Sequence, residues 1–235
     1  MSRTFRLAFS MRRVARFAAC GTLAIWLLAL SAAAVLAQDA RQNQPGEFDF
    51  YVLSLSWSPS FCDAAGERAN RQAECLERPY SFVVHGFWPQ YEKGFPEYCQ
   101  VPAPRLDRNI VSSMLDLMPA PRLIFHEWDR HGTCSGLPPR AYFETIRKAR
   151  AVVKIPPEFL DIKSELTVTP GDVQEAFVKV NPGLTPAAMA VGCDNKRLRE
   201  IRICMNRDLA FRDCAEVERR SCRRDKLVMP PVRGS

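Results

Sequence analysis

The sequence has only one long apolar run, at its N-terminus, so a protein with several membrane-spanning helices is excluded. It has no internal repeat and no low-complexity tract, and its 18 prolines and 11 glycines do not suit a coiled coil or a fibre. It also lacks the fingerprints of P-loop and dinucleotide-binding proteins and the G-x-S-x-G motif of serine hydrolases. An ordinary globular protein of 235 residues, with 47% hydrophobic and 25% charged residues, fits these absences.

Most of the chain also has little excess of basic over acidic residues. The net charge is +7, but five arginines and no acidic residue lie before residue 38. The rest of the chain therefore carries only +2, and its total charge does not by itself indicate a nucleic-acid partner.

The first 37 residues are typical of a secretory signal peptide. Their arginines precede an apolar segment that begins at Leu23, and Val35-Leu36-Ala37 forms a small-residue cleavage site before Gln38. We expect residues 1–37 to be removed and residues 38–235 to form one secreted or periplasmic domain without a membrane attachment. An uncleaved membrane anchor is the alternative interpretation of the same segment.

Cysteine pairs at the close spacing of zinc sites are absent as well. The closest two cysteines after the signal-like segment, Cys214 and Cys222, are eight positions apart. An even number of cysteines in an exported chain predicts four disulfides rather than a metal site. The eight cysteines are Cys62, Cys75, Cys99, Cys134, Cys193, Cys204, Cys214 and Cys222.

The apolar pattern predicts strands in unequal clusters. Strand-like runs cover residues 48–57 and 80–85, and the second run is expected to stop at Gly86. Near the C-terminus, apolar residues at 201, 203 and 205 alternate with polar ones, which predicts a half-buried strand. Residues 38–46 are polar and are expected to form a loose arm.

Helices are predicted between these strands. Helical spacing of apolar residues covers 110–118, 123–131, 139–153 and 170–180. The mixture favours an α+β fold in which helices pack on a central antiparallel sheet, as one disulfide-stapled domain.

Histidine is rare, and its three occurrences fall in two short segments. His85 lies in FVVHGFWPQY at 82–91, whereas His126 and His131 lie in FHEWDRHGTC at 125–134. Because histidine gains and loses protons near neutral pH, this clustering indicates acid–base chemistry.

The second segment has helical spacing of its polar side chains. His126 lies four positions before Arg130, and a helix would place the two on one face. Glu127 stands in the same relation to His131. Gly132 is expected to end the helix and leave His131 in the last turn, where the helix dipole favours imidazolium.

Several histidines, a carboxylate and a fixed cation suit the cleavage of RNA. The ribose 2′-hydroxyl already lies beside the phosphorus, so the substrate supplies its own nucleophile. The enzyme must remove the hydroxyl proton, protonate the leaving 5′-oxygen and stabilise charge on the phosphoryl oxygens. Two histidines in opposite protonation states and an arginine meet these needs, and DNA lacks the nucleophile.

The two segments closely resemble the paired active-site motifs of the ribonuclease T2 family. Residues 85–89 (HGFWP) are similar to the first motif and residues 126–134 (HEWDRHGTC) to the second. The likeness extends to residues 48–62 and to the cysteine-rich tail. It implies cleavage of single-stranded RNA through a 2′,3′-cyclic phosphate, without metal or other cofactor. We expect a monomer with no stable protein partner.

The resemblance also implies roles for individual residues. His131 would be the general base on the 2′-hydroxyl, and His85 the general acid on the leaving oxygen. His126 would bind phosphate, while Glu127 and Arg130 would stabilise the transition state. Arg130 stands where lysine is commonest in the family, so the charge is kept but the planar guanidinium differs from an ammonium.

Two further residues would contact the bases of the RNA. Trp88 would pack against a base, and Gln90 stands where some relatives carry an acid that contacts the base. Since an indole face accepts every base, we expect a broad base preference.

Structural roles are implied for other parts of the chain. The family pattern pairs Cys62–Cys75, Cys99–Cys134, Cys193–Cys222 and Cys204–Cys214. Trp128 is expected in the core, and Thr133 is expected to be structural. The arginine-rich tail at 219–224 is interspersed with acids and is expected to be a solvated face of mixed charge.

Two rival functions are open at this point. A zinc hydrolase is suggested by a superficial likeness of 126–131 to H-E-x-x-H, but the two histidines are one position too far apart for chelation by one helix. A non-catalytic RNA-binding or inhibitor module would not need the complete set of His85, His126, Glu127 and His131.

Overall fold

The computed structural model describes residues 42–76 and 78–233, so the expected signal peptide lies outside the described residues. From residue 43 onward the chain forms one compact unit. Within the described ranges, no helix is long and apolar enough to cross a membrane.

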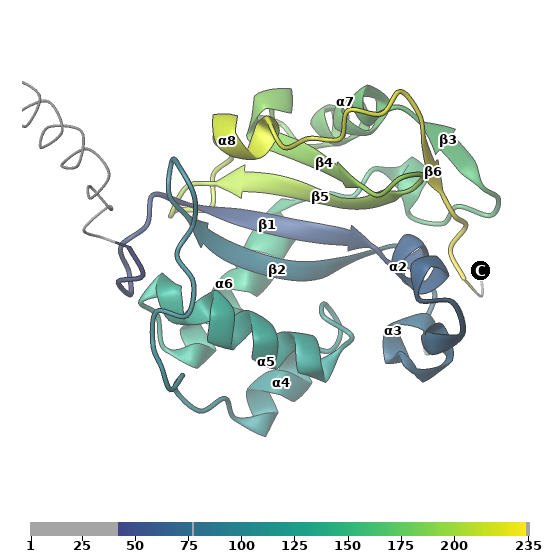
Figure 1. Cartoon of the computed structure of the whole chain (residues 1–235). Helices are drawn as coiled ribbons and strands as arrows, with labels where there is room; N and C mark the ends of the chain where they lie inside the picture. The colour runs from purple at the N-terminus through teal and green to yellow at the C-terminus, as the bar shows by residue number, and fades with distance from the viewer. Residues whose placement is uncertain (1–41, 77, 234–235) are drawn as a thin grey trace, which may run out of the picture. The chain divides into compact units, whose positions relative to one another are not determined.

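An antiparallel sheet of four strands forms the centre of this unit (Figure 1). Its strands, in spatial order, are β2 (Phe82–Gln90), β1 (Phe50–Trp57), β5 (Leu198–Met205) and β4 (Met189–Cys193). A second, two-stranded antiparallel sheet pairs β3 (Leu166–Val168) with β6 (Leu227–Met229). The predicted α+β fold with a central antiparallel sheet is therefore confirmed.

Helices pack against this sheet from two sides (Figure 1). The helices are α2 (Ser58–Ala65), α3 (Ala73–Leu76), α4 (Arg108–Met114), α5 (Pro121–Arg130), α6 (Pro139–Val152), α7 (Pro170–Val180) and α8 (Ala215–Glu218). In Figure 1, α4, α5 and α6 lie together beyond β2, whereas α7 and α8 lie near β4. Short 3-10 turns lie at Gly66–Arg71, Gly132–Ser135, Pro157–Phe159 and Pro186–Ala188.

Helices α6 and α7 begin where the sequence predicts, whereas α5 begins two residues earlier, at Pro121. A proline occupies the first turn of α5, α6 and α7, where its missing N–H costs no helical hydrogen bond. Thr169 and Asp172 also form a capping box at the start of α7. In α6, the apolar residues at helical spacing are buried, and the hydroxyl of Tyr142 donates a hydrogen bond to the carbonyl of Phe87 at 2.6 Å. This contact joins α6 to the core side of β2.

Strand β2 does not stop at Gly86 as predicted, but continues to Gln90. Ser54 of β1 is paired with Gly86 and Leu55 with Val84, so His85 is an additional residue at a bulge. The strand also tolerates Pro89, because β2 is an edge strand whose only partner is β1.

The bulge determines where the side chains of β2 point. Two residues apart on a regular strand, side chains share a face. Here Phe87 is fully buried in the core, whereas His85 lines a cleft on the other face. The same segment of β2 thus supplies both a core residue and a residue of the candidate site.

Part of the expected loose arm is fixed to the fold. The amide of Gly46 donates to the carbonyl of Cys134 at 2.9 Å, and the amide of Asn43 donates to the hydroxyl of Tyr91 at 3.1 Å. The side-chain oxygen of Asn43 accepts a further hydrogen bond from the amide of Glu97. The prediction is therefore wrong at Asn43 and Gly46, because these two residues are hydrogen-bonded to the domain.

Four disulfides join the eight cysteines in the pairs that the family resemblance implies. Cys99–Cys134 connects the turn after α5 to the loop after β2, and Cys193–Cys222 connects β4 to the C-terminal segment. Both crosslinks join parts of the chain that border the candidate site.

Candidate active site

Helix α5 supplies three side chains that face one cleft, and its C-terminal cap supplies a fourth, because the other face of the helix is anchored in the core. Trp128 is 1% exposed, and its indole N–H donates to the carbonyl of Pro104 at 2.7 Å, which confirms its predicted structural role. The hydroxyl of Thr133 donates to the carbonyl of Asp129, which confirms a structural role for this residue too.

Helix α5 ends at Arg130, and His131 caps it. Gly132 does not adopt a left-handed conformation; it begins a 3-10 turn, and a Cβ at this position would come within 2.4 Å of Trp128 and 2.8 Å of Tyr142. The helix end is predicted correctly, but the glycine is needed for close packing rather than for its φ angle.

The cleft has a volume of about 310 Å³ and lies between α5, β2, β5 and α8. It contains every side chain that the sequence predicts for the site, namely His85, Trp88, Gln90, His126, Glu127, Arg130 and His131. It also contains Val52, Phe95, Arg202, Glu216, Val217 and Arg220, which the sequence analysis does not assign to it. The two histidine motifs, far apart in the chain, therefore meet in one cleft.

His85 is held by a carboxylate from β5. Its Nδ1 lies 2.9 Å from Oε2 of Glu200, which also accepts a hydrogen bond from the hydroxyl of Ser54 at 2.8 Å. The other oxygen of Glu200 accepts from the guanidinium of Arg202 at 2.8 and 2.6 Å. Because this carboxylate can only accept, Nδ1 of His85 carries the proton and Nε2 remains available in the cleft.

These contacts shift two pKa values in opposite directions. Burial would raise the pKa of Glu200, but its hydrogen bond with His85 and the charge of Arg202 lower it to about 2. Burial would lower the pKa of His85, but the hydrogen bond and negative charge of Glu200, together with Glu127, outweigh burial and raise it. His85 therefore favours its protonated form.

Glu200 is a residue that the sequence analysis misses. Its alternating strand is predicted as half-buried, with the polar side chains facing solvent, but Glu200 is only 8% exposed and faces His85. The sequence offered one signal for this site: Glu200 and Arg202 are two positions apart, so a strand places both on the same face. Only the pairing of β5 with β1, which places Ser54 opposite Arg202, identifies what this face contacts.

His131 has the opposite electrostatic environment. It is 8% exposed, and burial, with the charges of Arg130, His126 and His85, lowers its pKa to about 3. Its Nδ1 is buried without a hydrogen-bond partner among the described residues. The prediction that the helix dipole favours imidazolium here is wrong, because desolvation and the neighbouring cations outweigh the dipole.

Trp88 lies between the two histidines and touches the buried glutamate. Its ring centroid is 5.3 Å from that of His85 and 5.5 Å from that of His131. Its indole N–H donates to Oε2 of Glu127 at 2.6 Å. Burial raises the pKa of Glu127 to about 7, although the charge of His85 and this hydrogen bond oppose the shift.

Gly86 leaves the space that this contact needs. A Cβ on Gly86 would lie 2.1 Å from the indole nitrogen of Trp88 and 2.2 Å from Oε2 of Glu127. Both distances are too short for any side chain, so glycine is required for packing.

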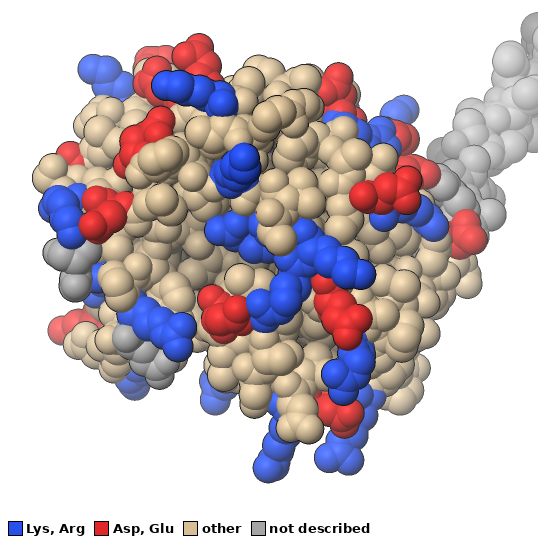
Figure 2. Space-filling model, turned by 180° about the vertical axis from the view of Figure 1, so that it is seen from behind, with Lys and Arg blue, Asp and Glu red and all other residues tan. Residues whose placement is uncertain are grey.

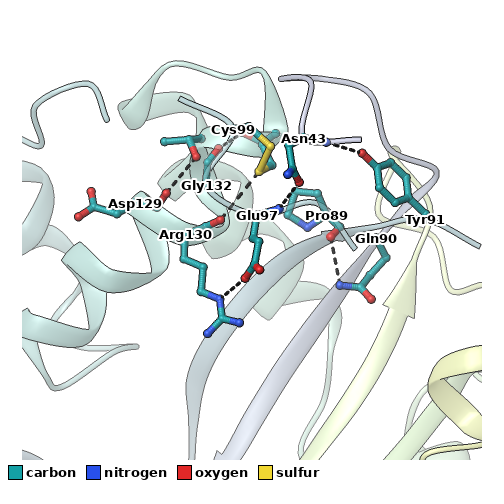
Figure 3. The surroundings of a disulfide bond; sticks show 12 residues. Asn43, Pro89, Gln90, Tyr91, Glu97, Cys99, Asp129, Arg130 and Gly132 are labelled. Carbon is teal, nitrogen blue, oxygen red and sulfur yellow. Dashed lines mark hydrogen bonds and ion pairs between the residues drawn. A yellow bond between two sulfur atoms is a disulfide. The ribbon is translucent and has the colours of Figure 1, made fainter. Parts of the chain in front are cut away.

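Arg130 and Gln90 are oriented by neighbouring groups at the mouth of the cleft (Figure 3). The Nε of Arg130 donates to Glu97 at 2.9 Å, and both side chains are more than one third exposed. The amide of Gln90 donates to the carbonyl of Pro89 at 3.0 Å. Glu97 lies in the loop that Cys99–Cys134 ties to the end of α5, so the disulfide borders this corner of the site.

The arginine-rich tail is an exposed face of mixed charge, as predicted, and it also borders the cleft. Arg220 lines the cleft and forms an ion pair with Glu216 of α8. The amide of Cys222 donates to the carbonyl of Val191 at 2.7 Å, which fixes this segment to the edge strand β4. Arg220 is exposed and paired with an acid, as a solvated face of mixed charge predicts, but the crosslink to β4 also brings it to the cleft.

A family model described as the Ribonuclease T2 family matches residues 48–214, which include both histidine motifs and Glu200. A ribonuclease of Aeromonas hydrophila is 45% identical over 96 residues, 41% of this chain and 42% of that protein. A probable ribonuclease of Haemophilus influenzae is 32% identical over 127 residues, 49% of this chain and 47% of that protein. The matched regions thus span less than half the length of these two relatives.

Solved structures show the same fold. An RNase-related protein from Calystegia sepium superimposes with a TM-score of 0.63 at 20% identity, covering 79% of this chain and 98% of that one. Since the family model matches residues 48–214, more than half of the sequence, this chain belongs to the Ribonuclease T2 family.

Proposed function

We propose that this protein is an endoribonuclease that cleaves single-stranded RNA by transphosphorylation through a 2′,3′-cyclic phosphate. The observation that carries the proposal is the pair His85 and His131, which share one cleft and have pKa values shifted in opposite directions. A protonated acid and a neutral base at the same pH are what this reaction requires.

In the proposed mechanism, neutral His131 takes the proton from the ribose 2′-hydroxyl. The 2′-oxygen attacks phosphorus while the bond to the 5′-oxygen breaks, and Nε2 of His85 donates a proton to that leaving oxygen. The products are a 2′,3′-cyclic phosphate and a free 5′-hydroxyl. The substrate supplies the nucleophile, so the protein contributes proton transfer and charge stabilisation.

The remaining residues would act on charge and position. His126 and Arg130 would contact the phosphoryl oxygens, and Glu127, buried against Trp88, would face the transition state at the same centre. Glu200 would be a positioning residue, because its hydrogen bond fixes the tautomer of His85 and favours its protonated form. Trp88 and Gln90 would contact the bases with a broad base preference.

Export is part of the proposal. The signal-like segment 1–37 and four disulfides support a secreted or periplasmic protein, and we propose that residues 38–235 act as a monomer. Sequencing the N-terminus of protein recovered from a bacterium that expresses the whole chain should give Gln38. A chain that keeps residue 1 and sediments with membranes would support the anchor instead.

The central experiment is digestion of a defined RNA in the presence of EDTA, followed by analysis of the ends. We expect cyclic-phosphate ends and undiminished activity. Replacing His85 or His131 by Ala should each lower kcat by roughly 10²–10⁴-fold, the usual contribution of a general acid or base. Loss of activity in EDTA would favour a metal hydrolase, and RNA binding without cleavage would favour a non-catalytic module.

A further inference from the structure

Two further hollows lie next to the candidate active cleft. Arg202 and Arg220 line both the cleft and a second hollow, which lies along β4 and β5. Cys193 lines this second hollow and also a third one, between the residues after β4 and the segment before β6. The shared lining residues place the three hollows next to one another, from the cleft with the histidines to the edge strand β4.

The path has a strong excess of basic side chains. Seven basic residues line the second and third hollows, against three carboxylates. The basic residues are Lys196, Arg199, Arg202, Arg220, Arg223, Arg224 and Lys226. We call this set the basic track. The chain after residue 37 carries a net charge of only +2, so this concentration is local.

Two of the three carboxylates are already occupied. Glu200 binds His85 and Arg202. The side chain of Asp194 accepts hydrogen bonds from the backbone amides of Lys196 and Arg197 and forms ion pairs with Arg197 and Arg199, each at 3.7 Å. Asp225 is exposed. The carboxylates along the track therefore do not neutralise its outer cations.

Three cations at the outer end are available to a ligand. Lys196, Arg223 and Lys226 are exposed, and their side chains make no hydrogen bond or ion pair within residues 42–76 and 78–233. The backbone that carries them is fixed, since Cys222 is bonded to Cys193 and the hydroxyl of Ser221 accepts from the amide of Val191 at 2.9 Å. On the face shown in Figure 2, Lys and Arg side chains gather near the middle, beside a hollow.

The lining of the track suits phosphate groups rather than bases. Among the described residues that line the second and third hollows, none is aromatic, whereas Trp88 and Phe95 line the cleft itself. Stacking on aromatic rings is how proteins hold unpaired bases, and Lys and Arg contact the backbone phosphates. A nucleic-acid strand on the track would therefore be held without regard to its sequence.

We propose that the basic track binds the backbone phosphates of a single-stranded RNA that extends out of the active cleft, across β5 and the edge strand β4. This inference rests on the proposed function and names a preferred substrate, a long RNA strand rather than a short oligonucleotide. Arg202 and Arg220 line both the cleft and the second hollow, so they would contact the RNA where it leaves the cleft. The outer cations Lys196, Arg223 and Lys226 would lengthen the binding site.

The test removes the outer cations and leaves the cleft unchanged. The track variant combines Lys196→Gln, Arg223→Gln and Lys226→Gln. The control variant combines Arg140→Gln, Lys148→Gln and Lys154→Gln, an equal loss of exposed charge at residues that line none of the three hollows. Each protein is assayed on a dinucleotide, which fills only the cleft, and on an unstructured RNA of about 30 nucleotides.

We expect the track variant to lose about 10-fold in kcat/KM on the long RNA and to cleave the dinucleotide at the rate of the parent. Binding of a 2′-O-methyl strand of the same length, which cannot be cleaved, should show a salt slope smaller by about 2, from about 0.7 per lost phosphate contact. The control variant should match the parent in all three measurements.

Two results would overturn the proposal: a track variant that equals the parent on long RNA, or one that loses equally on both substrates. Failure of the proposed function is a separate outcome, because the parent would then cleave neither substrate. In that case, the track is still tested by binding of the uncleavable strand, because the salt dependence of its affinity should be weaker for the track variant than for the parent.

Discussion

At the scale of single residues, the contact between His85 and Glu200 determines which nitrogen of the histidine acts in the proposed mechanism and over which pH range. Glu200 raises the pKa of His85, and a general acid works only below its own pKa. Neutral His131, with its pKa near 3, is available as a base down to acidic pH. We expect kcat/KM to be bell-shaped, with the acid limb near pH 3 and the alkaline limb above 6.5.

Replacing Glu200 by Gln should move the alkaline limb of this profile to lower pH. Without the carboxylate, burial and Arg202 both disfavour the protonated form of His85, so its pKa falls. We also expect kcat to fall by about 100-fold, as expected for a general acid that loses its protonation and tautomer. Glu200→Asp keeps a carboxylate, so we expect a smaller shift of the alkaline limb and a smaller loss of kcat than in Glu200→Gln. A variant with lower thermal stability and an unmoved pH profile would show that Glu200 is merely structural.

Trp88 can be tested by two substitutions that separate its face from its N–H group. Trp88→Ala should lower kcat/KM on RNA by roughly 10–100-fold, the kinetic equivalent of one stacked base. Trp88→Phe keeps an aromatic face but removes the donor to Glu127, so we expect an intermediate loss and a higher pKa for Glu127. Melting temperatures should be measured on the same samples. If the folded fraction of the Ala variant cleaves normally, Trp88 does not contact the substrate.

At the scale of elements, the bulge in β2 allows one strand to serve both core and cleft, and Gly86 makes it possible. We expect Gly86→Ala to reduce kcat by at least about 100-fold, because a methyl group there must displace Trp88 or Glu127. Gly183→Ala is a useful comparison, since the structure shows nothing within 4 Å of a Cβ there, although its φ of +86° adds backbone strain. Activity near that of the parent in Gly86→Ala would contradict the proposed packing.

The crosslink at the end of α5 should matter for both stability and activity. Cys99–Cys134 closes 35 residues, which corresponds to about 4 kcal/mol in the loop-entropy model. Replacing both cysteines by Ser should lower the free energy of unfolding by about that amount and lower kcat as well, because Arg130 and Glu97 lie beside the bond. The matched control removes Cys62–Cys75, which closes 13 residues and lies outside the cleft lining. If both variants have equal activity per folded molecule, the Cys99–Cys134 disulfide contributes to stability but not to catalysis.

At the scale of the whole molecule, the sequence predicts what is local and misses what depends on pairing. Helix α5 and its polar residues could be predicted because spacing along one helix fixes their relative positions. The location of His85 in the cleft could be predicted because its motif is short and specific. Glu200 could not, because its role depends on β5 pairing with β1 rather than with another strand. The need for glycine at position 86 could not be predicted either, because a Cβ there would collide with Trp88 and Glu127, whose hydrogen bond is seen only in the structure.

The same dependence applies to the basic track. Arg220 and Arg223 look like ordinary charged residues of a tail, and acids lie close to them in the sequence. Their significance comes from the bond between Cys193 and Cys222, which fixes the tail at the edge of β4. Total charge is equally uninformative, because the distribution of a net +2 over the surface is set by the fold.

The order of the strands has a consequence for how the protein is made. His85 and its partner Glu200 are 115 positions apart, and β5 enters the sheet beside β1 only after nearly the whole chain has been synthesised. A ribosome that has completed both histidine motifs carries a nascent chain with all three histidines, but without the carboxylate that sets the acid. In the proposed mechanism, the acid therefore gains its positioning carboxylate only at a late stage of synthesis.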